Sequence, residues 1–365
     1  MQLPIGLSLS GEALLAWQAG AAQHLAFSVT RACPLRCEHC IVSTVAPGAA
    51  GHATVTGSLA ADWAAQMPAV ARAGVTRVTF TGGEPLLAPA VLDVLSDAAA
   101  EAGIQVTVVT AAHWARSAAS TAKVLTRFAH IRNWHLSTDV FHARFIPTAQ
   151  VLRAARAARE RGHNVVIRTA VDKPPTAAQS ALCAEIAAGL PAGVGIDVEP
   201  VLHEGRAASR PHAPYAPWRR SVPCISTGPV VHDDGAVSPC CGGLADTPEQ
   251  WPWPLPDART TPLAQIQRAW REQPAMQLIR AVGFAPMLAW AQAAGAPVAD
   301  PPPDHPCAIC TELWRHPQTV AALRDRLADP VVTNKIGGVY DALFSPSSAD
   351  QATHHPTGNG EGKPR

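Results

Sequence analysis

Residues 31–40 read Arg-Ala-Cys-Pro-Leu-Arg-Cys-Glu-His-Cys, so Cys33, Cys37 and Cys40 follow one another in the spacing C-x3-C-x2-C. Three thiolates this close in sequence can converge on one metal centre, and three ligands leave one coordination position open for chemistry. The same spacing also allows a zinc site completed by His39 or a distant residue, or reduced cysteines without a metal. The cysteines alone therefore predict a metal site without deciding which metal it holds.

A second informative segment, residues 79–85, reads Thr-Phe-Thr-Gly-Gly-Glu-Pro and ends a predicted strand. Because glycine has no Cβ, Gly82 and Gly83 allow a ligand to approach the backbone closely. The Glu84 carboxylate, which precedes Pro85, can accept hydrogen bonds from an amino group. The segment therefore predicts a ligand site at the end of this strand.

The region around these segments, from residue 24 to about residue 200, alternates short β-rich runs with alanine-rich helical stretches. This alternation is typical of a parallel sheet wrapped by helices. In the helical stretch after Gly57, Pro68 predicts a kink or an early stop. Six strands in this arrangement fit an α/β fold of the partial (β/α)6, TIM-like barrel type. The predicted strands are 24–30, 77–81, 105–110, 134–137, 165–170 and 195–200.

After about residue 206 the alternation stops, and proline and tryptophan become frequent, as in Trp-Pro-Trp-Pro at 251–254. We therefore predict a smaller, loop-rich C-terminal domain, which carries five of the nine cysteines. From Ser345 onward the chain has almost nothing to bury, which predicts disorder. The expected organisation is an N-terminal extension (1–23), the barrel (24–214), the C-terminal domain (215–344) and a disordered tail (345–365).

The composition and the first residues indicate which compartment and which binding partners to expect. With 29 basic and 28 acidic residues, the chain has no net field that would attract nucleic acid or an anionic membrane, so neither is an expected partner. The first residues lack the cationic region of a secretory signal, and no run of about 20 apolar residues could span a bilayer. We expect a cytoplasmic protein, in which cysteines are metal ligands or reactive thiols before they are disulfides.

Together, the cysteine motif and the Gly-Gly-Glu-Pro segment resemble the radical S-adenosylmethionine (SAM) superfamily, over about residues 24–206. The resemblance implies that Cys33, Cys37 and Cys40 hold a [4Fe-4S] cluster whose fourth iron is chelated by the methionine part of SAM. It also implies that residues 82–85 contact the methionine amine. One electron from the cluster would cleave SAM into methionine and a 5′-deoxyadenosyl radical, which abstracts hydrogen from the substrate.

Further segments match the family in the expected order. Ser137 and Asp139 resemble the family's fourth-strand Ser-x-Asp, which helps to place SAM, and Phe-His at 141–142 follows as in relatives. Glu-Gly-Arg-Ala at 204–207 is similar to the segment that commonly closes the barrel. One departure is Thr-Ala-Ala at 110–112, where many members have Thr-Asn-Gly. This departure implies a differently shaped substrate side.

The C-terminal cysteines form a second group, in which Cys224 is followed by Gly-x4-Cys ending at Cys240 and later by Cys307-x2-Cys310. The pattern resembles SPASM and twitch domains, the auxiliary-cluster modules of many peptide-modifying radical SAM enzymes. A full SPASM domain has cysteines for two extra clusters, and this chain does not. The resemblance implies one auxiliary [4Fe-4S] cluster held by these four cysteines. A four-cysteine zinc site is the alternative.

One cysteine of this second group, Cys241, is left over. A thiol beside the cluster and facing the active site could donate a hydrogen atom to a substrate radical, as a peptide epimerase requires. We therefore treat Cys241 as the candidate catalytic residue. Alternatively, it is a small buried hydrophobe or exchanges with Cys240 as a ligand. Cys183, within a helical stretch, is expected to serve packing only.

The resemblance implies an enzyme that modifies a peptide or protein substrate, for example by epimerisation, crosslinking or oxidation during maturation of a ribosomally made peptide. This substrate class rests on analogy. The alternatives are a radical SAM enzyme that acts on a small metabolite, and a non-catalytic iron–sulfur or zinc-binding scaffold. A flavodoxin or ferredoxin is the expected electron donor. About 23 residues precede the first strand, too few for the leader-binding domain of some relatives.

Overall fold

The computed structural model describes residues 11–51, 53–210, 223–299 and 305–344. The predicted disordered tail, the first ten residues of the N-terminal extension and the predicted domain boundary at 214/215 lie outside these ranges. Within them, the chain forms one eight-stranded, mostly parallel sheet and twelve α-helices. None of the described helices is long and apolar enough to cross a membrane.

The first six strands form the predicted partial barrel. They lie side by side in chain order, and each pairs in parallel with its neighbour. The α/β fold class is therefore confirmed, and each strand starts or ends within two residues of its prediction. The strands are β1 (His24–Ser28), β2 (Arg77–Thr81), β3 (Gln105–Thr110), β4 (Asn133–Ser137), β5 (Asn164–Val171) and β6 (Gly195–Pro200).

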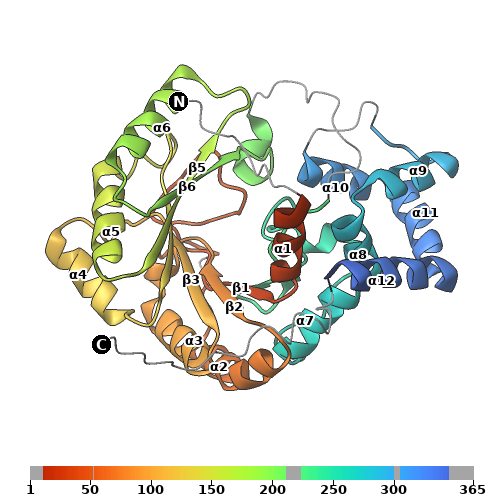
Figure 1. Ribbon diagram of the computed structural model, residues 1–365, viewed down its shortest axis with the longest axis horizontal. Helices are drawn as coiled ribbons and strands as arrows, with labels where there is room; N and C mark the ends of the chain where they lie inside the picture. Colours follow the sequence, from red (N-terminus) through yellow and green to blue (C-terminus); the bar gives the residue numbers. More distant parts are fainter. Residues whose placement is uncertain (1–10, 52, 211–222, 300–304, 345–365) are drawn as a thin grey trace, which may run out of the picture.

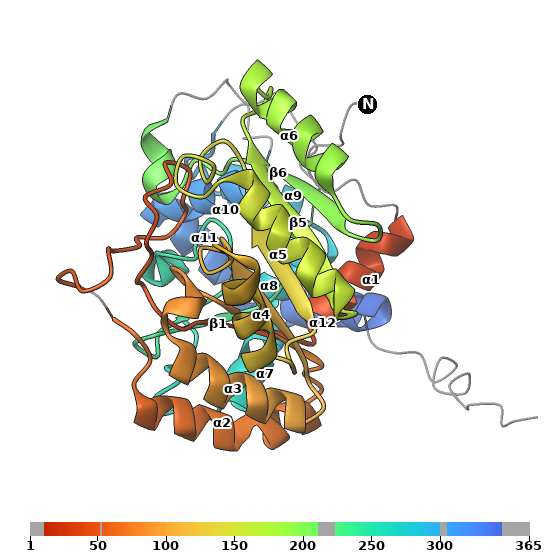
Figure 2. The ribbon, with the colours of Figure 1, turned by 90° about the vertical axis from the view of Figure 1, so that its left-hand side faces the viewer.

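Five helices connect these strands and cover the outer side of the curved sheet (Figure 1). Figure 2 looks onto this helical layer. Helix α2 continues four residues beyond Pro68, so the early stop predicted there is wrong. The helices are α2 (Gly57–Arg72), α3 (Pro89–Glu101), α4 (Ala118–Arg127), α5 (Thr148–Glu160) and α6 (Ala177–Gly189).

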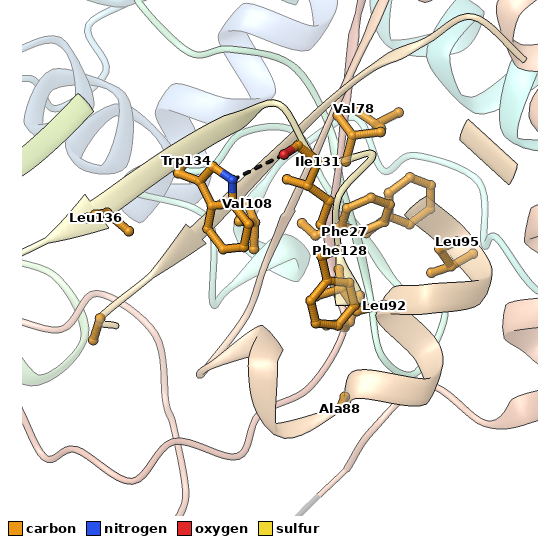
Figure 3. Close-up of a cluster of buried hydrophobic side chains, with 14 of the residues drawn as sticks. Phe27, Val78, Ala88, Leu92, Leu95, Val108, Phe128, Ile131, Trp134 and Leu136 are labelled. Carbon is orange, nitrogen blue, oxygen red and sulfur yellow. Dashed lines mark hydrogen bonds between the residues drawn. The ribbon is translucent and has the colours of Figure 1, made fainter. Parts of the chain in front are cut away.

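The main hydrophobic core lies between the sheet and these helices (Figure 3). Phe27 of β1 stacks on Phe80 of β2 with ring centroids 5.6 Å apart and touches Trp63 of α2 at 5.7 Å. The buried Trp134 indole of β4 donates to the Ile131 carbonyl over 3.1 Å. Each such large side chain stabilises the fold by about 1.5–3 kcal/mol on burial. Packing of the outer face of the sheet against the helices therefore holds the strands in place.

The sheet does not end with the barrel strands. Strand β7 (Val230–His232) pairs in parallel with β1, and β8 (Val237–Ser238) pairs with β7 in antiparallel orientation. Residues of the predicted C-terminal domain thus extend the sheet at its β1 edge. The loop and strand that follow Cys224 are held against the barrel by backbone hydrogen bonds.

The C-terminal part contains more helix than a loop-rich domain would. Four of its six helices begin at a proline, which has a fixed φ and lacks the N–H that the first helical turn leaves unused. The proline-rich composition therefore marks helix starts as well as loops. The helices are α7 (Leu263–Glu272), α8 (Pro274–Ala281), α9 (Ala285–Ala293), α10 (Pro306–Arg315), α11 (Pro317–Ala328) and α12 (Pro330–Phe344).

Helix α1 (Gly11–Ala21) joins the N-terminal extension to this C-terminal part (Figure 1). The Trp17 indole donates to the Ile225 carbonyl over 3.1 Å, and the Gln18 amide donates to the Cys224 carbonyl over 2.5 Å. The extension therefore packs beside the second cysteine group. Trp251 and Trp270 belong to a separate C-terminal core, as expected for packing residues.

We expect Ala112→Gly to stabilise the protein. Ala112 is fully buried and has φ 57°, a left-handed conformation that costs a residue with a Cβ about 1–2 kcal/mol. Glycine relieves this strain but loses about 0.5–1 kcal/mol of chain entropy. The free energy of unfolding, measured with denaturant, should rise by about 0.5–1 kcal/mol. Ala115→Gly, at a buried alanine without positive φ, should lower it, and equal effects would contradict the assignment of strain.

Candidate functional site

The first three cysteines lie in the long loop that follows the carboxyl end of β1. Backbone hydrogen bonds of 2.9 Å from Arg31 N to Ala53 O and from Cys33 N to Val45 O hold this loop together. Burial raises the pKa of the Cys33 thiol to about 12, and the neighbouring Glu84, Cys40 and Cys37 add to this effect. The structure thus brings the three predicted cluster ligands close to the Gly-Gly-Glu-Pro segment.

The two glycines of this segment face the cysteine loop. Gly83 N donates to Thr30 O over 2.6 Å, and Glu84 N donates to Ala32 O over 2.7 Å. A Cβ at Gly82 would lie 2.4 Å from Thr30 O, and one at Gly83 would lie 2.2 Å from Ala32 O. The predicted close approach is therefore made by the protein backbone itself, which leaves no room for a side chain.

Glu84 joins this segment to the end of β3. Its Oε1 accepts from Thr110 Oγ1 over 2.7 Å and from Leu86 N over 3.2 Å, and its Oε2 accepts from Ala111 N over 2.9 Å. Pro85, which follows, is buried and begins a short 3-10 turn. A carboxylate offers about four acceptor sites, and His113 Nδ1 lies 3.6 Å from Oε2, beside the one that remains.

Asp139 organises the turn after β4. Ser137 is the last residue of that strand. Its Oδ1 accepts from the backbone N of Phe141 and of His142, both over 2.9 Å, and its Oδ2 lies 2.8 Å from His142 Nδ1. Burial would raise the pKa of Asp139, but His142, with His39, lowers it to about 2. Burial would lower the pKa of His142, but Asp139 raises it to about 10. The two groups therefore form a buried ion pair.

His39 completes this end of the barrel and was considered from the sequence only as a zinc ligand. Its ring stacks on Phe141 with centroids 4.5 Å apart, and its Nε2 lies 3.4 Å from Asp139 Oδ2. Burial lowers its pKa to about 4, so the ring is neutral at pH 7. Ligand atoms of Cys37, His39 and His142 lie within 4.8 Å of one another, which also permits a metal ion at these three residues.

Several buried polar atoms at the carboxyl ends of the strands have no hydrogen-bond partner. They include His39 Nδ1 after β1, His113 Nδ1 after β3, Thr138 Oγ1 after β4 and Asp233 Oδ2 after β7. Buried polar groups are almost always paired in folded proteins. These atoms, with the remaining site on Glu84, therefore fit a polar ligand beside the cysteine loop, as SAM would be.

The Glu-Gly-Arg-Ala segment holds the cysteine loop from the other side. Arg206 donates from its backbone N to Cys40 O over 2.9 Å and from Nε to Cys37 O over 3.0 Å. Gly205 has φ 55°, and a Cβ there would lie 2.7 Å from Ile41 O. Glu204 Oε1 accepts from Thr311 Oγ1 of α10 over 3.0 Å. The segment thus links the first cysteine loop to the helix that carries the last two cysteines.

The inner face of the barrel is polar on the side of β5 and β6. Arg168 is paired in register with Asp197, and Nε lies 3.9 Å from its carboxylate. Burial and the neighbouring Asp197 raise the pKa of Glu199 to about 7. Val198, between the two acids, packs on the outer side with Cys183 of α6, so the acids point inward. A bound substrate would meet charged and hydrogen-bonding groups on this wall.

The second cysteine group is brought together from three segments and is half-buried. Burial raises the pKa of Cys240 to about 12 and raises the pKa values of Cys224, Cys307 and Cys310 as well. Each of the last two thiols is close enough to Cys224 and Cys240 for their charges to interact. The Trp314 indole N–H lies 3.0 Å from Cys310 Sγ. The four cysteines predicted from the sequence as ligands therefore lie near one another in the structure.

The sulfurs of this group are not gathered as closely as around one zinc ion. A tetrahedral zinc ion with Zn–S bonds of ~2.3 Å holds its sulfurs ~3.8 Å apart. Among the described residues, only the group of Cys37, His39 and His142 has three ligand atoms mutually within 4.8 Å. The four C-terminal sulfurs are thus more widely spread than around a single ion, which fits a larger inorganic group.

The second group lies at the opposite end of β1 from the first. Because β7 runs parallel to β1, the chain from Cys224 to Thr227 lies by the amino end of β1, where Thr227 O is 2.6 Å from His24 Nδ1. A five-residue strand spans ~16 Å. Cys241 is exposed at this end, with Sγ 3.4 Å from Thr227 Oγ1. Contact between Cys241 and a substrate would thus require the substrate to reach this end.

Comparisons with known proteins agree with this geometry. Residues 27–174 match the sequence model of the Radical SAM superfamily. Streptococcus suis SuiB bound to precursor peptide SuiA has the same fold, with TM-score 0.52 and 15% identity over 71% of this chain. This chain spans 66% of the SuiB chain, just under two thirds. Histidine-tagged anSMEcpe with bound AdoMet matches with TM-score 0.48 and 12% identity, over 87% of this chain and 98% of that chain. No curated protein sequence gives a significant match.

The structure is a partial α/β barrel with a three-cysteine loop at the carboxyl edge of its sheet. Residues 27–174 of this chain form a radical SAM domain. The family binds a [4Fe-4S] cluster and SAM, and the cysteine loop, Glu84 and the unpartnered polar atoms fit these groups. The family match ends before the second cysteine group.

We expect Gly83→Ala to lose the first cluster. The new Cβ would lie 2.2 Å from Ala32 O, which is backbone and can move only by displacing the cysteine loop. Iron and sulfide measured after anaerobic reconstitution should fall by about half if the second group also binds a cluster. Gly57→Ala, where a Cβ meets no atom within 4 Å, is the control and should keep all its iron. Full iron in both variants would contradict the proposed constraint.

Proposed function

We propose that this protein cleaves SAM reductively and uses the radical formed to abstract hydrogen from a peptide or protein substrate. The observation that carries the proposal is the convergence of Cys33, Cys37 and Cys40 with Glu84 at the carboxyl edge of the sheet. Three thiolates leave the fourth iron of a [4Fe-4S] cluster free for the methionine part of SAM. The family match covers these residues.

The chain's own residues would position the cofactor. Glu84 Oε2, which accepts one hydrogen bond and lies 3.6 Å from His113 Nδ1, would accept from an amine, and the unpartnered Thr138 Oγ1 lies on a neighbouring strand end. Asp139 is committed to His142 and to the turn, so its role is to position that turn. A bound cluster would supply the single electron that breaks a C–S bond of SAM and yields methionine and the 5′-deoxyadenosyl radical.

A second [4Fe-4S] cluster at Cys224, Cys240, Cys307 and Cys310 is part of the proposal. Four half-buried cysteines whose sulfurs are spread more widely than around one zinc ion support it, as does the indole N–H directed at Cys310. Residues 215–344 would then act as a SPASM/twitch-like auxiliary-cluster domain. One-electron chemistry also requires an external donor of the flavodoxin or ferredoxin type.

The peptide substrate rests on two observations. A solved structure with the same fold, SuiB, is bound to a precursor peptide. The inward-facing Arg168, Asp197 and Glu199 offer charged and hydrogen-bonding partners of the kind that a peptide backbone and its side chains use. A short precursor-peptide gene beside this gene would support the peptide, whereas small-metabolite genes alone would favour the alternative substrate. We propose a cytoplasmic setting for this chemistry.

We expect anaerobically reconstituted protein to hold about eight irons per chain and to give an EPR signal, after reduction, that SAM perturbs. Replacing Cys33, Cys37 and Cys40 together with alanine should leave about four irons and abolish 5′-deoxyadenosine formation, measured by chromatography after reduction with dithionite. An unchanged amount of 5′-deoxyadenosine formed by this variant would contradict the assignment of the first cluster. About four irons with zinc in the unmodified protein would instead make the second site structural.

Cys241→Ala separates the roles open to this thiol. If Cys241 donates a hydrogen atom, the variant should keep all its iron and its SAM cleavage but accumulate off-path products from the substrate radical. Mass spectrometry of the products and iron analysis give the two readouts. Cys183→Ala is the matched control, because Cys183 packs against Val198 on the outer side of the sheet. Loss of iron in Cys241→Ala would make this residue a ligand, and unchanged products would leave it without a catalytic role.

A further inference from the structure

Arg280, on α8, is a buried cation that lacks a carboxylate partner. Its side chain is 1% exposed. Among the described Asp and Glu residues, none has an oxygen within 4.0 Å of it, whereas other arginines with such partners are largely at the surface. A guanidinium stays charged in proteins, and burying a charge without a counter-charge is strongly unfavourable. The fold therefore requires an anion close to this residue.

The contacts that Arg280 does make are neutral. Nη1 donates to Ser226 O over 3.1 Å, and Nη2 donates to Gln18 O over 2.5 Å. The guanidinium lies over the Trp270 ring, 4.7 Å from its centroid, while Nε has no partner. Carbonyl and aromatic partners orient the cation but carry no net charge. They do not supply the missing anion.

The second cysteine group lies directly beside it. Ser226, whose carbonyl accepts from Arg280, donates its own N–H to Cys224 Sγ over 3.4 Å. Residue 279, which precedes Arg280, accepts a backbone hydrogen bond of 2.8 Å from Cys224 N. Burial lowers the pKa of Arg280, while Tyr340 and the Cys224 sulfur act in the opposite direction. Besides the Tyr340 phenol, the Cys224 sulfur is thus the group beside Arg280 that can carry a negative charge, and Cys224 is a proposed cluster ligand.

We propose that Arg280 is the counter-charge of the second iron–sulfur cluster and, as a positioning residue, raises the reduction potential of that cluster. The inference rests on the proposed function, which places a cluster at these four cysteines. Four thiolates and the cluster core carry a net negative charge, and reduction adds one more electron to it. A fixed positive charge therefore stabilises the reduced state more than the oxidised state. Charge and hydrogen bonding around the sulfurs are established determinants of such potentials.

The arrangement also explains why the cation is an arginine tied to two segments. Its two nitrogens connect α1, through Gln18, to the loop after Cys224, so the charge is held at a fixed place. Lysine would retain the charge but could not make both contacts in this planar geometry. A lysine variant consequently separates the electrostatic role from the structural one.

The test compares Arg280→Gln and Arg280→Lys in the reconstituted full-length protein. Redox titration followed by EPR gives the midpoint potential of each cluster, and the first cluster is recognised because SAM changes its signal. We expect Arg280→Gln to shift the second cluster to a more negative potential, with the first cluster unchanged, and Arg280→Lys to lie closer to the unmodified protein. Circular dichroism checks that each variant is folded.

A matched control is Arg326→Met. Arg326 also lies over an indole, 5.6 Å from the centroid of Trp290, but it is half exposed and its Nη1 is 3.9 Å from Asp329. This variant should leave both potentials unchanged. If Arg280→Gln loses the second cluster altogether, about four irons per chain should remain, while Arg280→Lys keeps about eight.

Two outcomes overturn the proposal. One is an unchanged second-cluster potential and iron content in Arg280→Gln. The other is an equal shift, or an equal loss of iron, in Arg280→Lys and Arg280→Gln, because the hydrogen bonds rather than the charge would then matter. Failure of the proposed function is distinct from both, since it appears in the unmodified protein as about four irons or as zinc at the second site.

Discussion

The site depends first on one close contact between two backbones. Gly82 and Gly83 approach Thr30 and Ala32 so closely that no side chain fits between them, and two hydrogen bonds of 2.6 and 2.7 Å join the segments. This contact fixes the loop after β1 against the end of β2. The positions of the three cysteines relative to Glu84 follow from it. A ligand between them is therefore met by groups whose backbone is already in place, which is how preorganised sites act.

The same loop is held from its other side by a segment that also reaches the second cysteine group. Arg206 binds the carbonyl oxygens of Cys37 and Cys40, while Glu204, two residues earlier, binds Thr311 of α10. Helix α10 carries Cys307 and Cys310. A displacement of either cysteine group would thus strain this short link. The two metal sites of the proposed enzyme are mechanically joined although they lie at opposite ends of β1.

Much of the barrel could be predicted from sequence, because buried parallel strands and the cysteine loop are local patterns. The C-terminal helices were harder to predict, since proline marks both loops and helix starts and only packing decides between them. His39 has a local signal only as a possible zinc ligand between Cys37 and Cys40, and Arg280 has none. Their importance comes from contacts with Asp139, Gln18 and the Cys224 loop, which lie far away in sequence. The strain at Ala112 likewise appears only in the backbone angles.

The two cysteine groups differ in their electrostatic surroundings, and the difference matches the tasks proposed for them. Around the first group, the buried charges of Asp139 and His142 already neutralise each other, and polar atoms such as His39 Nδ1 are left for an exchangeable ligand. Around the second, the Cys224 sulfur lies beside a buried cation, Arg280, that has no carboxylate partner among the described residues. At a site that binds and releases SAM, the protein's own charges must be neutralised whether or not SAM is bound. At a site with a permanently bound group, the charge of that group can instead neutralise a buried side chain of the protein.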